Sequence, residues 1–564
     1  MHGHEMITKL STLWPELTLL VGAVCCLMVG LASQLEARKS AARIAAAALV
    51  LAGMLVPATQ PDHAAAFGEF AGIALFVKSA VLIVGFVLVL IMAYVPYQLK
   101  QSAEVEHAKV FDPGDAFRGE FFAMALFSLT GVMLTAGAND LVWLFLALEL
   151  TSLPTYVLVA TARDRIDAQE SGVKYFFLGA MSAAIFLYGF TLIYGATGFT
   201  EFAQYNANGE LTGGIRYVVQ QQLAANGSLS PLLITGVLLS LLGVAFKIAA
   251  FPMHFYAADV YEGATGSVTA FLAFVPKMAG FVALFLILTL VGWQYQIPGG
   301  NGHDLPQVIM WTLWGMAAIT MTLGNVLAMV QTNVKRILAY SSVAQSGYMI
   351  VGLLVGPALV SEVLPGGSVI GNGIAAVFFY MVAYGLASIA AFAALGTLSV
   401  RGEEAETLDD LDGLASRHPA IAAVLLIAVL SLIGIPPLAG FIGKVYLFGS
   451  AIKEGYIVIV VIAVLNSAMS AAYYLRISAR CFFGQASYDV DLFDAPGRKF
   501  GAALASAGVI FLGLFGGFVV SAADRSARPL PAVEPAAVAP TDDAATPEPA
   551  ASVSQRDEEE MVHG

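Results

Sequence analysis

The sequence of 564 residues has few charged residues and almost no cysteine. Only 12% of the residues are Asp, Glu, Lys or Arg, whereas 58% are hydrophobic, and the mean hydropathy is +0.79. These values exclude an ordinary soluble multidomain protein and indicate a membrane protein with many spans. The three cysteines, Cys25, Cys26 and Cys481, form neither a CxxC motif nor a metal-ligand cluster. The chain is therefore expected to hold no iron–sulfur cluster, haem, metal or disulfide framework of its own.

The sequence also offers no nucleotide-binding loop and no quinone-binding motif. Its first apolar run is not followed by a small-residue cleavage site, so this run is expected to remain as a helix. Much of the formal net charge of −13 arises in the loop 403–412 and in the tail 521–564. We interpret both segments as solvated surface rather than as a binding signal for nucleic acid or another partner. The tail is rich in Ala, Pro and acidic residues without apolar periodicity and is expected to be disordered.

Long apolar runs dominate the rest of the chain. Because about 20 apolar residues cross a bilayer, the sequence predicts an all-α polytopic fold with about fourteen transmembrane helices. The expected spans are residues 13–33, 41–59, 71–97, 118–137, 139–161, 170–195, 229–255, 266–292, 306–331, 334–356, 371–399, 418–449, 456–483 and 499–520.

The basic residues support this arrangement independently. If the N-terminus lies outside, sixteen basic residues fall in inside loops and six in outside segments. The positive-inside rule therefore predicts both termini on the outer side of the membrane. The inside residues are Arg38, Lys39, Arg43, Lys100, Lys109, Arg118, Arg163, Arg165, Lys335, Arg336, Arg401, Arg417, Arg476, Arg480, Arg498 and Lys499. The outside residues are Lys9, Arg216, Lys453, Arg525, Arg528 and Arg556.

The five remaining basic residues fall within the expected spans, and all five are lysine. A buried lysine can lose its proton, whereas an arginine effectively cannot. A set of intramembrane bases made only of lysine therefore suits proton transfer better than fixed structural charge. These residues are Lys78, Lys174, Lys247, Lys277 and Lys444.

Two apolar segments are interrupted by proline and carry one of these lysines. The segment 239–262, LSLLGVAFKIAAFPMHFYAADVYE, is expected to be a helix that carries Lys247 and breaks at Pro252. The segment 431–448, SLIGIPPLAGFIGKVYLF, has a Pro-Pro pair followed by Lys444. Paired discontinuous helices are typical of the ion path in transporters built from repeats.

The interrupted segments occupy corresponding positions in two sets of five spans, the fourth to eighth and the ninth to thirteenth. Because five is odd, the second set enters the membrane from the opposite side, as an inverted repeat requires. The match of SLLG at 240–243 with SLIG at 431–434 supports this pairing. The expected domains are helices one to three at 1–117, the first repeat at 118–292, the second at 306–483, helix fourteen at 484–520 and the tail at 521–564.

Glu149 lies about ten residues into its expected span, where a carboxylate needs a cationic partner. A buried lysine is the expected partner, and a structural ion pair that fixes helix packing is the alternative to a functional one. Lys247 and Lys277 lie in consecutive spans and are candidates for proton transfer. The alternative for Lys277 is a packing role near Pro276.

His254 and Lys174 are less certain candidates. His254 follows the first break, where water can reach it, and an imidazole that titrates near neutral pH can relay protons. It can equally be a structural hydrogen-bond donor. Lys174 lies near the start of its span and is either a relay or an anchor that extends to the membrane surface. Lys78 has the same ambiguity, and we favour a structural role for it.

Four runs of the sequence resemble the antiporter-like membrane subunits of respiratory complex I and of Mrp-type cation/proton antiporters. They are FKIAAFPMHFYAADVYEGA, VPKMAGF, QTNVKRILAYSSVAQSGYM and GIPPLAGFIGKVYLF. Similarity is greatest to the subunit N family of NADH–quinone oxidoreductase, because the opening LWPELTLLVGA, the run GKVYLF and the end after fourteen spans fit that family. L-type relatives carry a long lateral helix at the C-terminus, which has no counterpart here. The resemblance covers about residues 10–520.

The resemblance implies a 14-helix subunit with inverted five-helix repeats and discontinuous seventh and twelfth helices. It assigns Glu149 and Lys247 to the charge pair of an entry half-channel, Lys277 to a central relay and Lys444 to the other half-channel. Lys174 matches a lysine common in the sixth helix of this family.

Gln345, in the run SSVAQSGY, occupies a position where many relatives have histidine. This departure implies that water or Gln345 itself bridges the step between Lys277 and Lys444.

The resemblance further implies a proton-translocating subunit of an NADH:quinone oxidoreductase, driven by quinone reduction in other subunits. NADH, FMN, iron–sulfur clusters and quinone are then expected in partner subunits and not in this chain. The expected neighbours are M-type and K-type subunits within a bacterial inner membrane. Two alternatives stay open: a subunit of an Mrp-type sodium/proton antiporter, and a structural membrane subunit without its own proton path.

Overall fold

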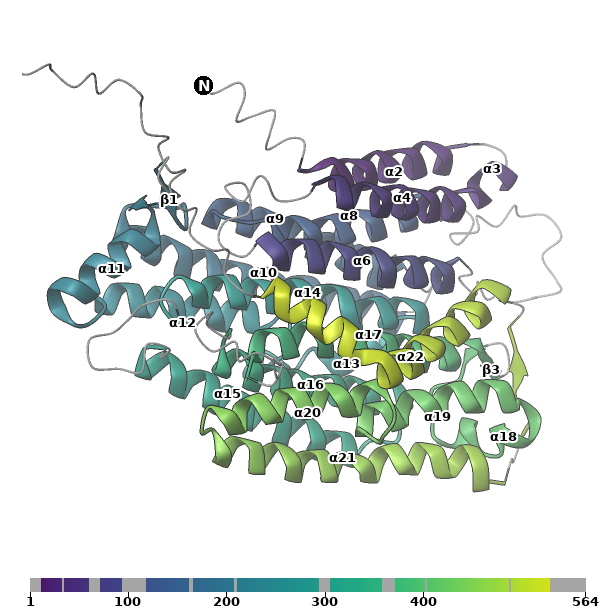
Figure 1. Cartoon of the computed structure of the whole chain (residues 1–564). Helices are drawn as coiled ribbons and strands as arrows, with labels where there is room; N and C mark the ends of the chain where they lie inside the picture. The colour runs from purple at the N-terminus through teal and green to yellow at the C-terminus, as the bar shows by residue number, and fades with distance from the viewer. Residues whose placement is uncertain are drawn as a thin grey trace, which may run out of the picture.

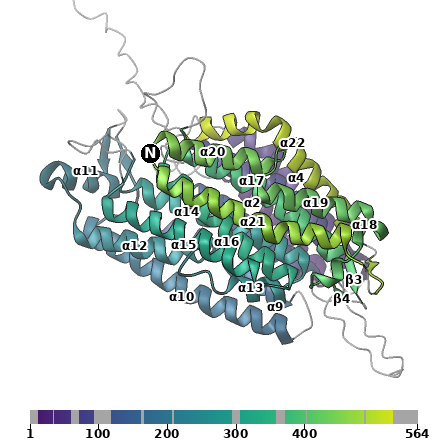
Figure 2. The same ribbon diagram turned by 90° about the horizontal axis from the view of Figure 1, so that it is seen from below.

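The computed structural model describes residues 12–32, 35–59, 71–93, 118–161, 166–206, 210–293, 305–357, 371–400, 403–485, 488–493 and 495–527. Long helices lie side by side along a common direction (Figures 1 and 2). In both views α11 lies at one end of this bundle, whereas α18 and β3 lie at the other. Most of the acidic tail, from residue 528, lies outside the described residues.

The N-terminal helices pack together through a buried ion pair. Lys78 Nζ on α6 lies 2.7 Å from Glu16 Oε1 on α2, and both side chains are buried. Such a pair is costly to break in a low-dielectric interior, so it ties α6 to α2 and supports a structural role for Lys78. The elements of this region are α2 (Trp14–Gly30), α3 (Leu35–Lys39), α4 (Ala41–Leu55), η1 (Val56–Thr59) and α6 (Ala71–Met92).

The next region contains the first interrupted helix and a polar segment that lies at one end of the bundle. The residues before α12 form a two-stranded hairpin and a helix of 12 residues, α11. The elements are α8 (Arg118–Ala136), α9 (Leu141–Thr161), α10 (Ile166–Thr197), β1 (Gln204–Tyr205), β2 (Leu211–Gly213), α11 (Ile215–Asn226), α12 (Pro231–Ala245), α13 (Ala257–Gly263) and α14 (Gly266–Thr289).

The last region contains the second interrupted helix and a three-stranded sheet in the order β4-β3-β5. Its elements are α15 (Gln307–Met329), α16 (Val334–Val355), α17 (Gly373–Thr397), β3 (Leu398–Val400), β4 (Glu403–Glu404), η4 (Asp409–Leu411), α18 (Leu414–Arg417), α19 (Pro419–Ile433), α20 (Ala439–Lys453), α21 (Ile457–Phe483), β5 (Asp491–Leu492) and α22 (Pro496–Ser526).

The expected all-α membrane fold is confirmed. Among the described residues, ten helices are long and apolar enough to cross a membrane, or eleven if the bent pair 409–417 and 419–433 is one span. Each of the fourteen expected spans contains helix, but several of these helices are short, so the count of fourteen stays a prediction. α14 is buried along its whole length, because its sequence is apolar on all sides and other helices surround it.

Both interruptions contain the expected prolines, but the first begins earlier in the sequence than expected. α12 ends at Ala245, so Lys247 lies within the break and not in the helix as expected. Proline lacks a backbone donor and cannot continue a helix, and here the helix ends well before Pro252. Within the break Ala249 has a φ of 52°, a left-handed conformation that is unusual for a residue with a Cβ atom.

The loop 403–412 and two basic residues differ from expectation. We predicted that this loop is solvated and that Lys335 and Arg498 are loop charges, but all of Lys335, Arg498 and Glu404 are buried. Glu404 Oε2 accepts hydrogen bonds from Lys335 Nζ at 3.0 Å and from the Gly266 N–H at 2.9 Å. Its Oε1 lies 3.4 Å from Arg498 Nη1. One carboxylate thus joins the first turns of α14, α16 and α22. The polarity of the loop sequence alone cannot show that Glu404 is buried.

Replacing Glu404 by Ala is expected to destabilise the chain by about 3–5 kcal/mol, because two buried cations lose a shared carboxylate. The melting temperature and the yield of the assembled protein measure the effect. Glu403→Ala, one residue away and exposed, is the matched control and is expected to leave both unchanged. Equal melting temperatures for the two variants would contradict the assignment of Glu404 as the link between these helices.

Candidate functional site

The first part of the candidate site is the ion pair between Glu149 on α9 and Lys247 in the first break. Lys247 Nζ lies 3.2 Å from Glu149 Oε1 and donates to Ser152 Oγ at 2.5 Å. Glu149 and Ser152 are three residues apart and therefore share one face of α9. The Lys247 side chain is 2% exposed and that of Glu149 is 17% exposed. The structure thus brings together the two residues that the sequence analysis paired.

Close packing of α14 fixes the position of Lys247. A Cβ atom on Gly280 would lie 2.6 Å from Ile248 Cγ2 and 3.0 Å from Lys247 Cβ. Only glycine therefore allows α14 to approach the break this closely.

Lys277 lies one turn before Gly280 on α14 and points at α16. Its Nζ donates to the Ser342 carbonyl oxygen at 2.5 Å and to Ser346 Oγ at 2.8 Å. It also lies 5.4 Å from the centre of the Tyr384 ring, within the range of a cation–π contact. The side chain is buried, and no carboxylate among the described residues pairs with it. Neutral oxygens and a ring face surround the amine, an environment in which a proton can be both held and released.

Ser346 connects Lys277 to the first break. Its hydroxyl accepts from Lys277 Nζ and donates to the Ile248 carbonyl oxygen at 2.6 Å. Because Ile248 follows Lys247 directly, Ser346 ties Lys277 to the backbone beside Lys247, and not to the Lys247 side chain.

Gln345 lies on the same face of α16 and connects to the second break. Its Nε2 donates to the Leu432 carbonyl oxygen at 3.2 Å, and its Oε1 accepts from Tyr380 Oη at 2.5 Å. Lys444 Nζ donates to the same Leu432 oxygen at 3.1 Å. Gln345 and Lys444 therefore share one acceptor, and the position that departs from the usual histidine is filled by a fully hydrogen-bonded amide.

Lys444 on α20 binds the end of α19. Its Nζ donates to the carbonyl oxygens of Leu432 and Ile433, the latter at 2.8 Å, and to Ser467 Oγ at 2.9 Å. The last carbonyls of a helix have no partner within the helix and carry partial negative charge. The break at Gly434, where φ is 92°, thus provides the acceptors that hold the buried ammonium group.

The remaining two candidates lie apart from this network. Lys174 forms ion pairs with Glu170 Oε1 at 2.8 Å and with Asp259 Oδ2 at 3.3 Å, and its side chain is 45% exposed. This position favours an anchor over a relay. His254 is half-buried beside Phe251, and it hydrogen-bonds none of the lysines within the described part of the chain.

Gln345 was expected between Lys277 and Lys444, but Ser342, Ser346 and the Leu432 carbonyl, which contact the lysines, were not. A partial signal exists in the run SSVAQSGY, because Ser342, Gln345 and Ser346 follow helical spacing and form one polar stripe on α16. The Leu432 carbonyl carries no sequence signal. No group of three or more His, Cys, Asp or Glu residues suited to a metal occurs among the described residues.

The sequence and the fold are similar to those of known proteins. The family model described as NADH:quinone oxidoreductase/Mrp antiporter, TM matches residues 138–470. NADH-quinone oxidoreductase subunit N of Trichlorobacter lovleyi is 38% identical over 411 residues, which cover 73% of this chain and 77% of the relative. Subunit N 1 of Rhizobium meliloti is 34% identical over 94% of this chain and 99% of the relative.

Solved structures show the same fold. A chain of respiratory complex I from Thermus thermophilus with bound aureothin has 29% identity and a TM-score of 0.67, over 90% of this chain and 98% of the other. A chain of the Mrp complex from Dietzia has 19% identity and a TM-score of 0.71, over 92% and 97%, which is a likeness of fold alone. The chain therefore belongs to the subunit N family of NADH-quinone oxidoreductase, a family of antiporter-like membrane subunits of respiratory complex I.

Proposed function

We propose that this subunit translocates protons through a line of groups that runs from Glu149 through Lys247 and Lys277 to Lys444. The observation that carries the proposal is that three buried lysines lie in a series, each with serine or carbonyl oxygens within hydrogen-bond distance. The polar stripe of α16 lies between Lys277 and Lys444, and Gln345 shares the Leu432 carbonyl with Lys444. Water completes the steps that no direct hydrogen bond spans.

The rearrangement of one ion pair changes the free energy by enough to move a proton against the membrane potential. Moving one charge across 100 mV takes about 2.3 kcal/mol, and close charge pairs have coupling energies of about 1.5–7 kcal/mol. We infer that Glu149 alternates between Lys247 and a neighbouring subunit. The partial exposure of the Glu149 side chain is consistent with such a second partner. When Glu149 moves away, Lys247 loses its counter-charge and releases a proton more readily. This change in turn alters the proton affinity of Lys277.

Membership of the subunit N family supports a proposal for the assembly. The redox chemistry then belongs to other subunits that bind NADH, FMN, iron–sulfur clusters and quinone, with M-type and K-type subunits as neighbours. The inverted repeats at 118–292 and 306–483 supply one half-channel each, in a bacterial inner membrane with both termini outside. The subunit itself is redox-inactive in this proposal.

Copurification tests the assembly. Purification of the tagged chain from its native membrane is expected to bring down flavin and iron–sulfur subunits, and the reconstituted complex is expected to acidify one side of a vesicle when NADH reduces quinone. Copurification with a small set of antiporter proteins only, together with sodium/proton exchange without NADH, would instead support the Mrp-type alternative.

Gln345 is the weakest step, since an amide transfers protons poorly and water must help. Gln345→His is expected to preserve or raise coupled turnover, because imidazole carries protons at neutral pH. Gln345→Leu is expected to lower it several-fold, because it removes the hydrogen bonds to Leu432 and Tyr380. Coupled turnover and proton-to-electron ratio in vesicles are the measurements. Full pumping by Gln345→Leu would remove Gln345 from the path.

A further inference from the structure

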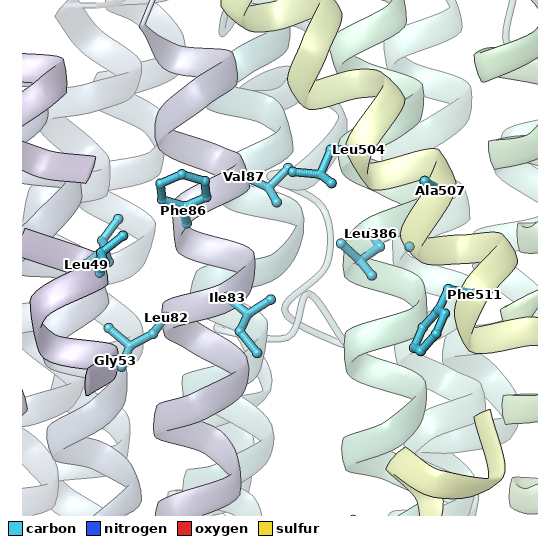
Figure 3. A pocket seen from close by; sticks show the side chains of 12 residues that line it. Leu49, Gly53, Leu82, Ile83, Phe86, Val87, Leu386, Leu504, Ala507 and Phe511 are labelled. Carbon is cyan, nitrogen blue, oxygen red and sulfur yellow. The ribbon is translucent and has the colours of Figure 1, made fainter. Parts of the chain in front are cut away.

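An apolar groove lies outside the lysine network, between α4, α6, α17 and α22 (Figure 3). Its volume is about 560 Å³, within the range of sites that enclose ligand-sized molecules. All of its lining residues are apolar, and they include Leu49, Phe86, Leu386, Leu504 and Phe511. The occupant of such a groove must itself be apolar over the enclosed part, because the lining side chains offer no hydrogen bonds.

The groove opens toward the outside of the helix bundle. Ile83 is 66% exposed and Phe511 is 55% exposed, and both side chains line it from opposite walls (Figure 3). A Cβ atom on Gly53, at one end, would meet nothing within 4 Å. The opening is therefore accessible from the hydrocarbon of the membrane.

A cationic side chain lies on the same helix face as the groove. Arg43, Val50 and Gly53 are spaced by seven and three residues, so they form one stripe along α4. Arg43 lies about 10 Å from Val50 along the axis at 1.5 Å per residue. It is exposed, and no acidic side chain among the described residues pairs with it.

We propose that this groove binds an acyl chain of an anionic phospholipid whose phosphate pairs with Arg43. Basic residues at the ends of transmembrane grooves select anionic headgroups. A partner helix fits poorly, since one helical turn alone occupies about 400 Å³ for a diameter of about 10 Å and a pitch of 5.4 Å. A quinone tail fits the apolar walls, but a neutral quinone head can only accept hydrogen bonds from Arg43, whereas a phosphate also forms an ion pair with it.

Photolabelling of the intact purified complex in nanodiscs tests the proposal. The probes are phosphatidylglycerol and phosphatidylcholine with a diazirine in the same acyl chain. Phosphatidylglycerol is expected to label peptides of α6 and α22 that contain Ile83 and Leu504 at least threefold more than phosphatidylcholine. Arg43→Gln is expected to remove this preference, and Gly53→Leu is expected to reduce labelling by both lipids several-fold by filling the groove.

Gly517→Leu is the matched control, because a Cβ atom on Gly517 also meets nothing within 4 Å and Gly517 does not line the groove. Its labelling is expected to equal that of the unaltered complex. Equal labelling by both lipids, no effect of Gly53→Leu, or crosslinking of these peptides to another polypeptide would each overturn the proposal. Stronger labelling by a diazirine analogue of an isoprenoid quinone would also overturn it.

Discussion

Replacing Lys277 by Ala is expected to lower NADH-driven proton translocation by the assembled complex by about tenfold or more, since a positioned proton-transfer group typically contributes about 10²–10⁴-fold to a rate. Lys277 is the only link between the two halves of the network that can carry a formal charge, since its contacts within the described residues are serine oxygens and a ring face. The initial rate of NADH-driven proton translocation into vesicles, normalised to the amount of assembled complex, measures the effect, and the proton-to-electron ratio is measured beside it.

Two controls separate proton transfer from packing. Lys277→Arg keeps the positive charge but holds its proton, so it is expected to assemble better than the Ala variant and to fail equally in pumping. Lys78→Met combined with Glu16→Gln removes a different buried lysine together with its carboxylate, away from the network, and is expected to leave stoichiometry unchanged. Normal stoichiometry with full activity in Lys277→Ala would defeat the proposed path.

A double-mutant cycle on Glu149 and Lys247 is expected to separate stability from pumping. Glu149→Gln and Lys247→Met each leave one charge without its partner, so each is expected to lower stability by a few kcal/mol. The double variant removes both charges and is expected to recover most of that stability. Pumping is expected to stay low in all three variants, because each of them lacks at least one of the two titrating groups of the pair.

The two readouts distinguish the proposal from a structural ion pair. Assembly yield and melting temperature report stability, and proton-to-electron stoichiometry of the assembled fraction reports pumping. If Lys247 and Glu149 only hold helices together, the double variant recovers stoichiometry together with stability. That outcome would favour the view of this chain as a structural subunit.

The sequence by itself determined the class of fold and identified the residues whose presence in a membrane span needs a specific reason. Apolar runs of bilayer length predict the helices, because the backbone must satisfy its own hydrogen bonds in hydrocarbon. Lysines and prolines in such runs cost free energy, so Lys247, Lys277 and Lys444 stand out without any structure. Charge alone predicted that Glu149 pairs with a buried lysine, the family resemblance singled out Lys247, and the structure confirmed their contact.

Only the tertiary structure decided which neutral groups surround these charges. Ser346 and the Leu432 carbonyl contact the lysines across 69 and 12 residues of sequence, and helix packing that no local pattern encodes creates such contacts. The same reason explains the wrong expectation for the loop 403–412. Whether Glu404 faces water or a buried pair of cations depends on what α16 and α22 place against it. The residue types alone show where a buried charge costs free energy. Only the packing of the helices shows which groups stabilise that charge.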